Sequence, residues 1–271
     1  RLHDADDTVA RTSRERTTVR VVQSQMAFWL AADHAAAAEI VRRTQAELAE
    51  ANAEPADYDD LHAAWSLMTT LADDPRAGLE LSHSLLDHDP NWILARAALA
   101  AGHSLAALGR PLDCLTLAHD TIQRYAELST DIARACERVL RSLTAYAHFL
   151  DGDLAAARRE AEQAVHESAE DHQRLLALMT LSTVEVYAGR PDTALGVLGQ
   201  AAAIPYQHTR GMTPRWMHTD ELIAAATAGD TDLAGRIELA YRADRHPARL
   251  LDVYGEIGSA RRLFATGHPE A

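Results

Sequence analysis

Lysine is absent from this chain, and all 26 basic residues are arginine. Without lysine there can be no G-x-x-x-x-G-K-[ST] phosphate-binding loop, so a nucleotide site of that kind is excluded. Acidic residues outnumber basic ones, 40 to 26, which gives a formal net charge of −14. Because that charge repels a phosphate backbone instead of releasing its counterions, we expect no direct binding of nucleic acid by this chain.

Cysteines and long apolar runs are also scarce. The two cysteines, Cys114 and Cys136, are too few for a disulfide framework, and they are best explained as buried thiols. No run approaches the roughly 18 apolar residues of a membrane span. The arginine-rich, apolar-poor residues 1–20 do not resemble a signal peptide. These absences predict a cytoplasmic protein that does not enter a membrane.

Catalytic and metal-binding patterns are missing as well. No G-x-S-x-G elbow occurs, and the acidic pairs fall at helix starts, where capping and the helix dipole account for them. His218 with Asp220, and His83 with Asp87 and His88, lie close in sequence, but no third ligand at a diagnostic spacing appears. We therefore expect no enzyme activity, no metal and no cofactor.

What the chain does contain is a repeated turn. A glycine or aspartate that suits the turn of a helical hairpin recurs at intervals of 36 to 43 residues. A small residue follows five positions later and lets the two helices approach closely. A proline sits two positions after several of these turns, where the first turn of a helix tolerates it. The turn positions are Asp33, Asp73, Gly109, Gly152, Gly189, Gly229 and Gly267.

Each turn predicts a hairpin of two helices. With 47% hydrophobic but only 5% aromatic residues, the composition favours thin stacked helices over one thick globule. The predicted fold is all-α, a right-handed α-solenoid of about six and a half hairpins that spans residues 1–271 as one domain. The turn at residues 267–269 leads us to expect a longer array. The expected helices are 17–32 with 35–51, 61–72 with 75–87, 92–108 with 111–128, 131–150 with 153–168, 170–188 with 191–202, 215–228 with 232–243, and 248–266 alone.

Two stretches carry a family resemblance. Leu108 and Gly109 with Cys114, and the run Asp-Gly-Asp-Leu-Ala-Ala-Ala at residues 151–157, resemble the turn and following alanine of tetratricopeptide repeats. The mean spacing here is about 39 residues, against roughly 34 in that repeat. Longer units of this kind in an alanine- and arginine-rich chain resemble the superhelical sensor region of large MalT-like LuxR-family transcriptional regulators of actinobacteria. In that family the region lies between an ATP-binding module and a helix-turn-helix, so the resemblance implies a sensor domain.

The tetratricopeptide geometry also predicts a groove. In that geometry the first helix of each hairpin lines the concave face, and the residues three, six and ten before each turn point into it. The resulting set has apolar walls with a few polar points, as ligand pockets do, and two aromatic residues on adjacent turns could close one end. The alternative is that these side chains pack on neighbouring helices because the superhelix is tight. The predicted groove residues are Leu99, His103, Tyr146, Phe149, Met179, Thr183, Tyr187, Trp216 and Thr219.

Two functions fit these expectations. The first is a sensor or effector domain of a transcriptional regulator that binds a small molecule or peptide in the groove. The second is a scaffold that binds a partner helix or peptide. A closed pocket around His103, Tyr146 and Trp216 would favour the sensor, whereas an open trough would favour the scaffold. The connector 204–214 holds Tyr206 and His208 among several residues that are common at binding sites.

Overall fold

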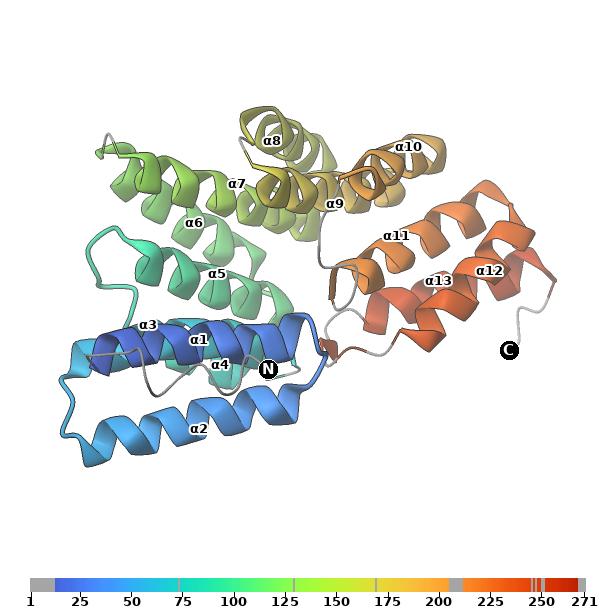
Figure 1. Cartoon of the computed structure of the whole chain (residues 1–271). Helices are drawn as coiled ribbons and strands as arrows, with labels where there is room; N and C mark the ends of the chain where they lie inside the picture. Colours follow the sequence, from blue (N-terminus) through green and yellow to red (C-terminus); the bar gives the residue numbers. More distant parts are fainter. Residues whose placement is uncertain are drawn as a thin grey trace.

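The computed structural model describes residues 13–72, 74–128, 130–168, 170–204, 212–244, 246, 248–249 and 252–267. Over these residues the chain forms thirteen helices and no strand, which confirms the predicted all-α class and the number of helices. They make six hairpins and a final single helix (Figure 1). The helices are α1 (Ser13–Trp29), α2 (His34–Glu50), α3 (Pro55–Leu71), α4 (Pro75–His83), α5 (Trp92–Ala107), α6 (Pro111–Ala126), α7 (Asp131–Asp151), α8 (Leu154–Glu167), α9 (Asp171–Tyr187), α10 (Pro191–Ala202), α11 (Met212–Ala228), α12 (Thr231–Ala243) and α13 (Asp252–Ala265).

Glycine makes most of the hairpin turns. The five predicted turn glycines have φ between 73° and 89°, the left-handed region where only glycine avoids a steric penalty. The first hairpin differs from the prediction, because Ala32 takes the positive φ of 54° there. Asp33 instead caps α2, and its carboxylate accepts a hydrogen bond from the Ala36 N–H at 2.9 Å. Asp73 lies outside the described residues, and its neighbour Asp74 caps α4 in the same way.

The small residues after the turns lie where the two helices of a hairpin meet. Cys114, Ala157, Ala194 and Ala234 are completely buried. At the equivalent Gly78, an added Cβ would lie 2.0 Å from the Thr70 hydroxyl oxygen. Larger side chains would therefore push the paired helices apart, as the sequence predicts.

Successive hairpins stack through their first helices. α1 packs on α3, α3 on α5, α5 on α7, α7 on α9, α9 on α11 and α11 on α13. Figure 1 shows these helices running from the blue end of the chain to the red end as a curved row. The architecture is thus a stacked array of helical hairpins, and its right-handed sense stays a prediction.

Some helix ends differ from the sequence-based expectation. α3 begins at Pro55, whereas the acidic segment 52–60 was expected to be a loop. Proline suits the first turn of a helix, and Asp57 there interacts favourably with the positive end of the helix dipole. α4 ends earlier than expected, at His83, and α13 starts later, at Asp252.

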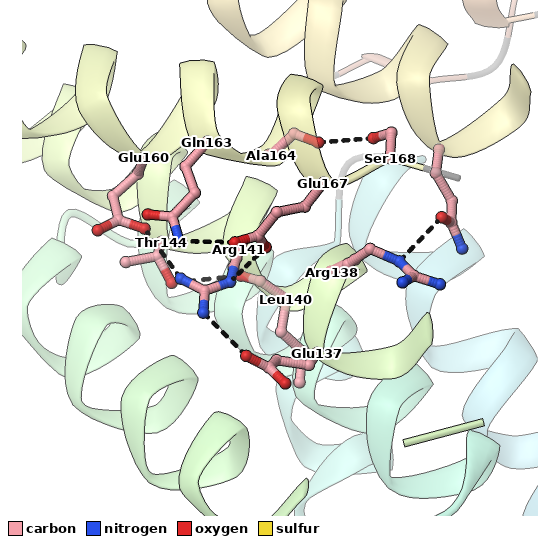
Figure 2. Close-up of polar contacts among 11 residues, drawn as sticks. Glu137, Arg138, Leu140, Arg141, Thr144, Glu160, Gln163, Ala164, Glu167 and Ser168 are labelled. Carbon is pink, nitrogen blue, oxygen red and sulfur yellow. Dashed lines mark hydrogen bonds and ion pairs between the residues drawn. The ribbon is translucent and has the colours of Figure 1, made fainter. Parts of the chain in front are cut away.

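An arginine fastens α7 to α8. The Arg141 guanidinium lies 2.8 Å from a Glu137 oxygen on its own helix and 3.1 Å from a Glu167 oxygen on α8. Glu160 of α8 is a third carboxylate, at 3.8 Å (Figure 2). All four side chains keep some solvent access, so we interpret this cluster as a clamp between two helices of one hairpin.

The array also closes on itself. The ring of His246, in the connection between α12 and α13, lies with Nε2 2.9 Å from the Phe28 carbonyl oxygen of α1. Its Nδ1 accepts the Ala248 N–H at 3.0 Å, so Nε2 carries the proton and donates it to Phe28. Ala248 is buried in the same cluster as Phe28 and Leu61. Residues 218 positions apart therefore meet.

The turn glycines allow a direct test of the backbone argument. Neither Gly152 (φ 89°) nor Gly196, inside α10, has an atom within 4 Å of where a Cβ would lie. Gly152→Ala should lower the free energy of unfolding by about 1–2 kcal/mol, because alanine is strained at positive φ. Gly196→Ala should raise it by about 0.5–1 kcal/mol, because alanine is the better helix former. Urea denaturation of the two variants would measure both, and an equal sign of the two changes would contradict the turn assignment.

Candidate functional site

A row of five aromatic rings runs across α5, α7, α9 and α13. It consists of His103, Tyr146, Phe149, Tyr187 and Tyr254, and we call it the aromatic ladder. Successive ring centroids lie 5.4, 6.2, 5.1 and 6.2 Å apart, distances at which aromatic pairs attract one another. Each of the five side chains is only partly buried. All five residues of the ladder therefore keep some contact with solvent.

The repeat register explains why these rings meet. His103 and Tyr146 both lie six residues before a turn glycine, so stacking of the hairpins places them side by side. Tyr146 and Phe149 share one face of α7 because they are three residues apart. Tyr187 ends α9, and its ring packs on Phe149. Four of the five rings were predicted from the sequence.

Tyr254 completes the ladder from the far end of the chain. Its hydroxyl oxygen lies 3.1 Å from that of Tyr146, 108 residues away. Burial raises the pKa of both phenols, so both hydroxyls are protonated and one donates to the other. The sequence does not predict Tyr254 as a groove residue, because it lies thirteen residues before Gly267 and not at one of the expected groove positions.

Behind the ladder lies a buried carboxylate. Asp220 of α11 is 2% exposed, and its Oδ2 lies 2.6 Å from the Ser182 hydroxyl and 2.7 Å from the Thr183 hydroxyl, both on α9. The Trp216 indole N–H donates to the Thr183 hydroxyl oxygen at 3.3 Å. Two hydrogen bonds therefore connect Trp216 to Asp220 through the Thr183 hydroxyl.

Asp220 has no cationic partner among the described residues. Burial raises the pKa of its carboxyl to about 7, although the two hydroxyl donors act in the opposite direction. From the sequence, Asp220 stands out only as a candidate metal ligand beside His218. The missed signal is its position, directly after the predicted groove residue Thr219 and within an alanine-rich helix.

Four predicted groove residues converge on one gap. Tyr146, Phe149, Thr183 and Trp216 line it together with Thr180 and Val184, and it is too narrow to hold a water molecule. His103 and Tyr187 join this group through their ring contacts in the ladder.

The other three predicted residues do not reach the gap. Met179 and Thr219 are buried, and Thr219 donates its hydroxyl hydrogen to the Arg215 carbonyl at 2.9 Å. Leu99 packs against the core cluster that contains Leu94. These three side chains therefore pack on neighbouring helices, which is the alternative to a groove position that the sequence left open.

Two polar atoms of the ladder are buried without a hydrogen-bond partner among the described residues, His103 Nδ1 and the Tyr187 hydroxyl. Burial lowers the pKa of His103 to about 4, so the ring is neutral at physiological pH. A buried polar atom left without a partner costs about 1–3 kcal/mol. A ligand that hydrogen-bonds to either atom would recover that free energy.

Other chemistry is not evident in the part of the chain that the structure describes. It holds no group of three or more His, Cys, Asp or Glu side chains suited to a metal ion. Cys114 and Cys136 are free and buried, as expected. None of the described helices has the length and apolar character needed to cross a bilayer. The connector residues Tyr206 and His208 lie outside the described residues.

Compared with known proteins, the chain matches no family model, and no curated protein is significantly similar to it.

Proposed function

We propose that this chain is a non-catalytic sensor or effector domain of a bacterial transcriptional regulator, and that it binds a small molecule or peptide at the aromatic ladder. The observation that carries the proposal is the partly exposed ladder with two unpaired polar atoms, His103 Nδ1 and the Tyr187 hydroxyl. Apolar walls with a few orienting polar groups are typical of ligand sites. The resemblance to the repeat regions of large regulators supports the regulatory role.

Closure of the array suggests how binding could be transmitted. Tyr254 touches Tyr146 and Tyr187, and the gap beside them has no room for a ligand group. A ligand must therefore separate α13 from α7 or displace Trp216. Binding then favours an open arrangement over the closed one, because only the open one offers the site. Such a shift changes the relative position of the first hairpin and α13.

A scaffold is the second candidate, and exposed apolar side chains favour it. Leu239 of α12 is 72% exposed, and Val253 and Phe264 of α13 are 63% and 74% exposed. Apolar side chains of this size on two neighbouring helices could hold a partner helix. In that case binding would depend on Leu239 and Phe264 and not on the ladder.

A thermal-shift screen of metabolites and short peptides tests the proposal. A ligand that binds the folded state alone raises the melting temperature by mass action. A compound that stabilises the parent, but neither Tyr146→Ala nor Trp216→Ala, would place a small-molecule site at the ladder. If only a protein partner shifts the melting temperature, and Leu239→Ser with Phe264→Ser abolishes the shift, the scaffold replaces the sensor.

Tyr187→Phe separates ligand binding from folding. It deletes a buried hydroxyl that has no partner, so the free energy of unfolding should stay the same or rise by about 1 kcal/mol. Affinity for a ligand that bonds to this hydroxyl should fall about threefold to tenfold. Tyr58→Phe on α3 is the matched control and should change neither quantity. Calorimetry measures the affinity, and a large loss of stability in Tyr187→Phe would contradict the unpaired hydroxyl.

A further inference from the structure

Two neighbouring acidic residues of α11 lie close to the ladder. Asp220 is buried behind Thr183, and only hydroxyl groups contact its carboxylate oxygen Oδ2 in the described part of the chain. Glu221, next to it on α11, adds a second acidic group that raises the pKa of Asp220. A buried charge without a counter-ion acts strongly on its neighbourhood, because little water screens it. Its field also reaches two ladder residues, since it raises the pKa of Tyr187 and Tyr254.

The ladder already attracts one cation. The Arg261 guanidinium lies 5.6 Å from the centroid of the Tyr187 ring, and it also donates to the Thr227 hydroxyl at 3.0 Å. Cations bind to aromatic faces through the ring quadrupole, and quaternary ammonium ligands are commonly held by several such rings. The rings of Tyr146, Phe149 and Trp216 line the gap, and a ligand that opens it would meet their aromatic faces. His103 is neutral there and does not repel a cation.

We propose that the ligand of the aromatic ladder is an organic cation, with an ammonium or guanidinium group that rests against Tyr146 and Phe149 once the gap beside them has opened, and that Asp220 supplies the balancing negative charge. This inference rests on the proposed ligand-binding function and names the chemical class of the ligand. Thr183 stands between Asp220 and the gap, so the carboxylate acts through its field and through the hydroxyl that it orients. Asp220 is thus a specificity-determining residue.

The charge state of Asp220 makes cation binding depend on pH. Its pKa is raised to about 7, so the carboxyl is mostly charged at pH 8 and mostly neutral at pH 6. The groups that face it are Glu221 on its own helix, the phenol of Tyr187 on α9, and the phenol of Tyr254 on α13. No charged side chain among the described residues of α10 and α12 shifts the pKa of Asp220. Both phenols stay protonated over this interval, so the pH effect comes from the two carboxyls, Asp220 and the partly buried Glu221, whose pKa is also raised.

Choline and its neutral isostere 3,3-dimethyl-1-butanol give a matched pair of probes. Both have the same shape, but only choline carries a positive charge. We expect choline at millimolar concentration to bind the parent at pH 8 at least about tenfold more tightly than the neutral alcohol. Choline affinity should fall by up to about tenfold between pH 8 and pH 6, as Asp220 takes up a proton. Titration calorimetry on the whole chain measures each value.

Asp220→Asn isolates the charge. Asparagine keeps the shape and an oxygen that accepts from Ser182 and Thr183, and it removes a buried charge, so the variant should fold. At pH 8 its choline affinity should be about tenfold lower than that of the parent, and it should depend less on pH because only Glu221 still titrates there. Asp120→Asn on the exposed face of α6 should match the parent.

Three results would overturn the inference: equal affinity for choline and the neutral alcohol, unchanged choline affinity in Asp220→Asn, or no choline binding at all. If the neutral alcohol or another uncharged compound binds and Tyr146→Ala abolishes that binding, the ladder is a ligand site but not a cation site. The proposed function then stands and only this inference fails.

Discussion

Phe28→Ala should lower the free energy of unfolding by about 3–5 kcal/mol, the usual range for deleting a fully buried phenylalanine. Phe28 is completely buried in the cluster with Val21 and Met68. Its ring contacts the His246 ring edge-on, with centroids 5.4 Å apart. The substitution therefore leaves a cavity in the first hairpin and removes a ring contact that closes the array. Because each hairpin depends mainly on its neighbours, the loss should be concentrated in α1 and α2.

Val22→Ala is the matched control for Phe28→Ala. Val22 lies on the same helix but is 49% exposed, so its truncation should change stability by less than about 0.5 kcal/mol. Denaturation followed by tryptophan fluorescence reports on this region, since Trp29 and Trp65 pack against the same cluster. A loss in Phe28→Ala no larger than in Val22→Ala would show that α1 does not dock as the structure describes.

Local rules accounted for most of the fold. A glycine at a positive φ, with a small residue five positions later, marks a hairpin whatever the rest of the chain does, and Gly109, Gly152, Gly189 and Gly229 follow that rule. The predicted start of α3, at residue 61, was wrong because the acidic segment 52–60 contains a proline and so resembles a loop. Pro55 and Asp57 in fact suit the first turn of a helix.

The candidate site was predictable only where repeat register sets it. His103 and Tyr146 occupy the same repeat position, so their contact follows from stacking. Tyr254 and His246 meet residues 108 and 218 positions away through the closure of the array. The amount of curvature that brings them together is a sum of small packing angles, and no local pattern in the sequence encodes it. The burial of Asp220 could not be predicted for a related reason, since its hydroxyl partners lie 37 and 38 residues away on another helix.

Closure and ligand binding are linked through shared residues. Trp216 packs against the cluster of the first hairpin and also against the cluster around Met179. The same indole lines the gap beside the ladder and donates to Thr183. A ligand that displaces Trp216 must therefore loosen contacts to both clusters. In the sensor that we propose, these shared contacts would couple ligand binding to the arrangement of the array.

His246 should make closure sensitive to acid. Burial lowers the pKa of its ring to about 4, although the hydrogen bond to the Phe28 carbonyl acts in the opposite direction. An unfolded histidine has a pKa of about 6.5. As the pH falls from about 6.5 to 4, the unfolded chain therefore takes up a proton that the folded chain does not, and the folded state loses stability. The expected loss from this one group is about 3 kcal/mol.

The parent curve alone would not isolate this effect, since other groups titrate in the same interval. His103, with its pKa also lowered to about 4, adds a loss of the same sign. Asp220 changes the folding stability in the opposite direction. Its pKa is raised to about 7, so its protonation favours the folded state as the pH falls from about 7 toward 4. The difference in stability between the parent and a variant at a single histidine cancels these contributions.

His246→Gln is the variant that isolates closure. Glutamine keeps an N–H donor for the Phe28 carbonyl and does not titrate. Near pH 7 the variant should be no more stable than the parent, because it loses the ring contact with Phe28. As the pH falls to about 4, the difference should shift by about 3 kcal/mol in favour of the variant. Urea denaturation at a series of pH values measures it, with His166→Gln, at an exposed position of α8, as the matched histidine-to-glutamine control. A pH-independent difference for His246→Gln would mean that the ring is solvated, and that the connection between α12 and α13 does not dock on α1 in solution.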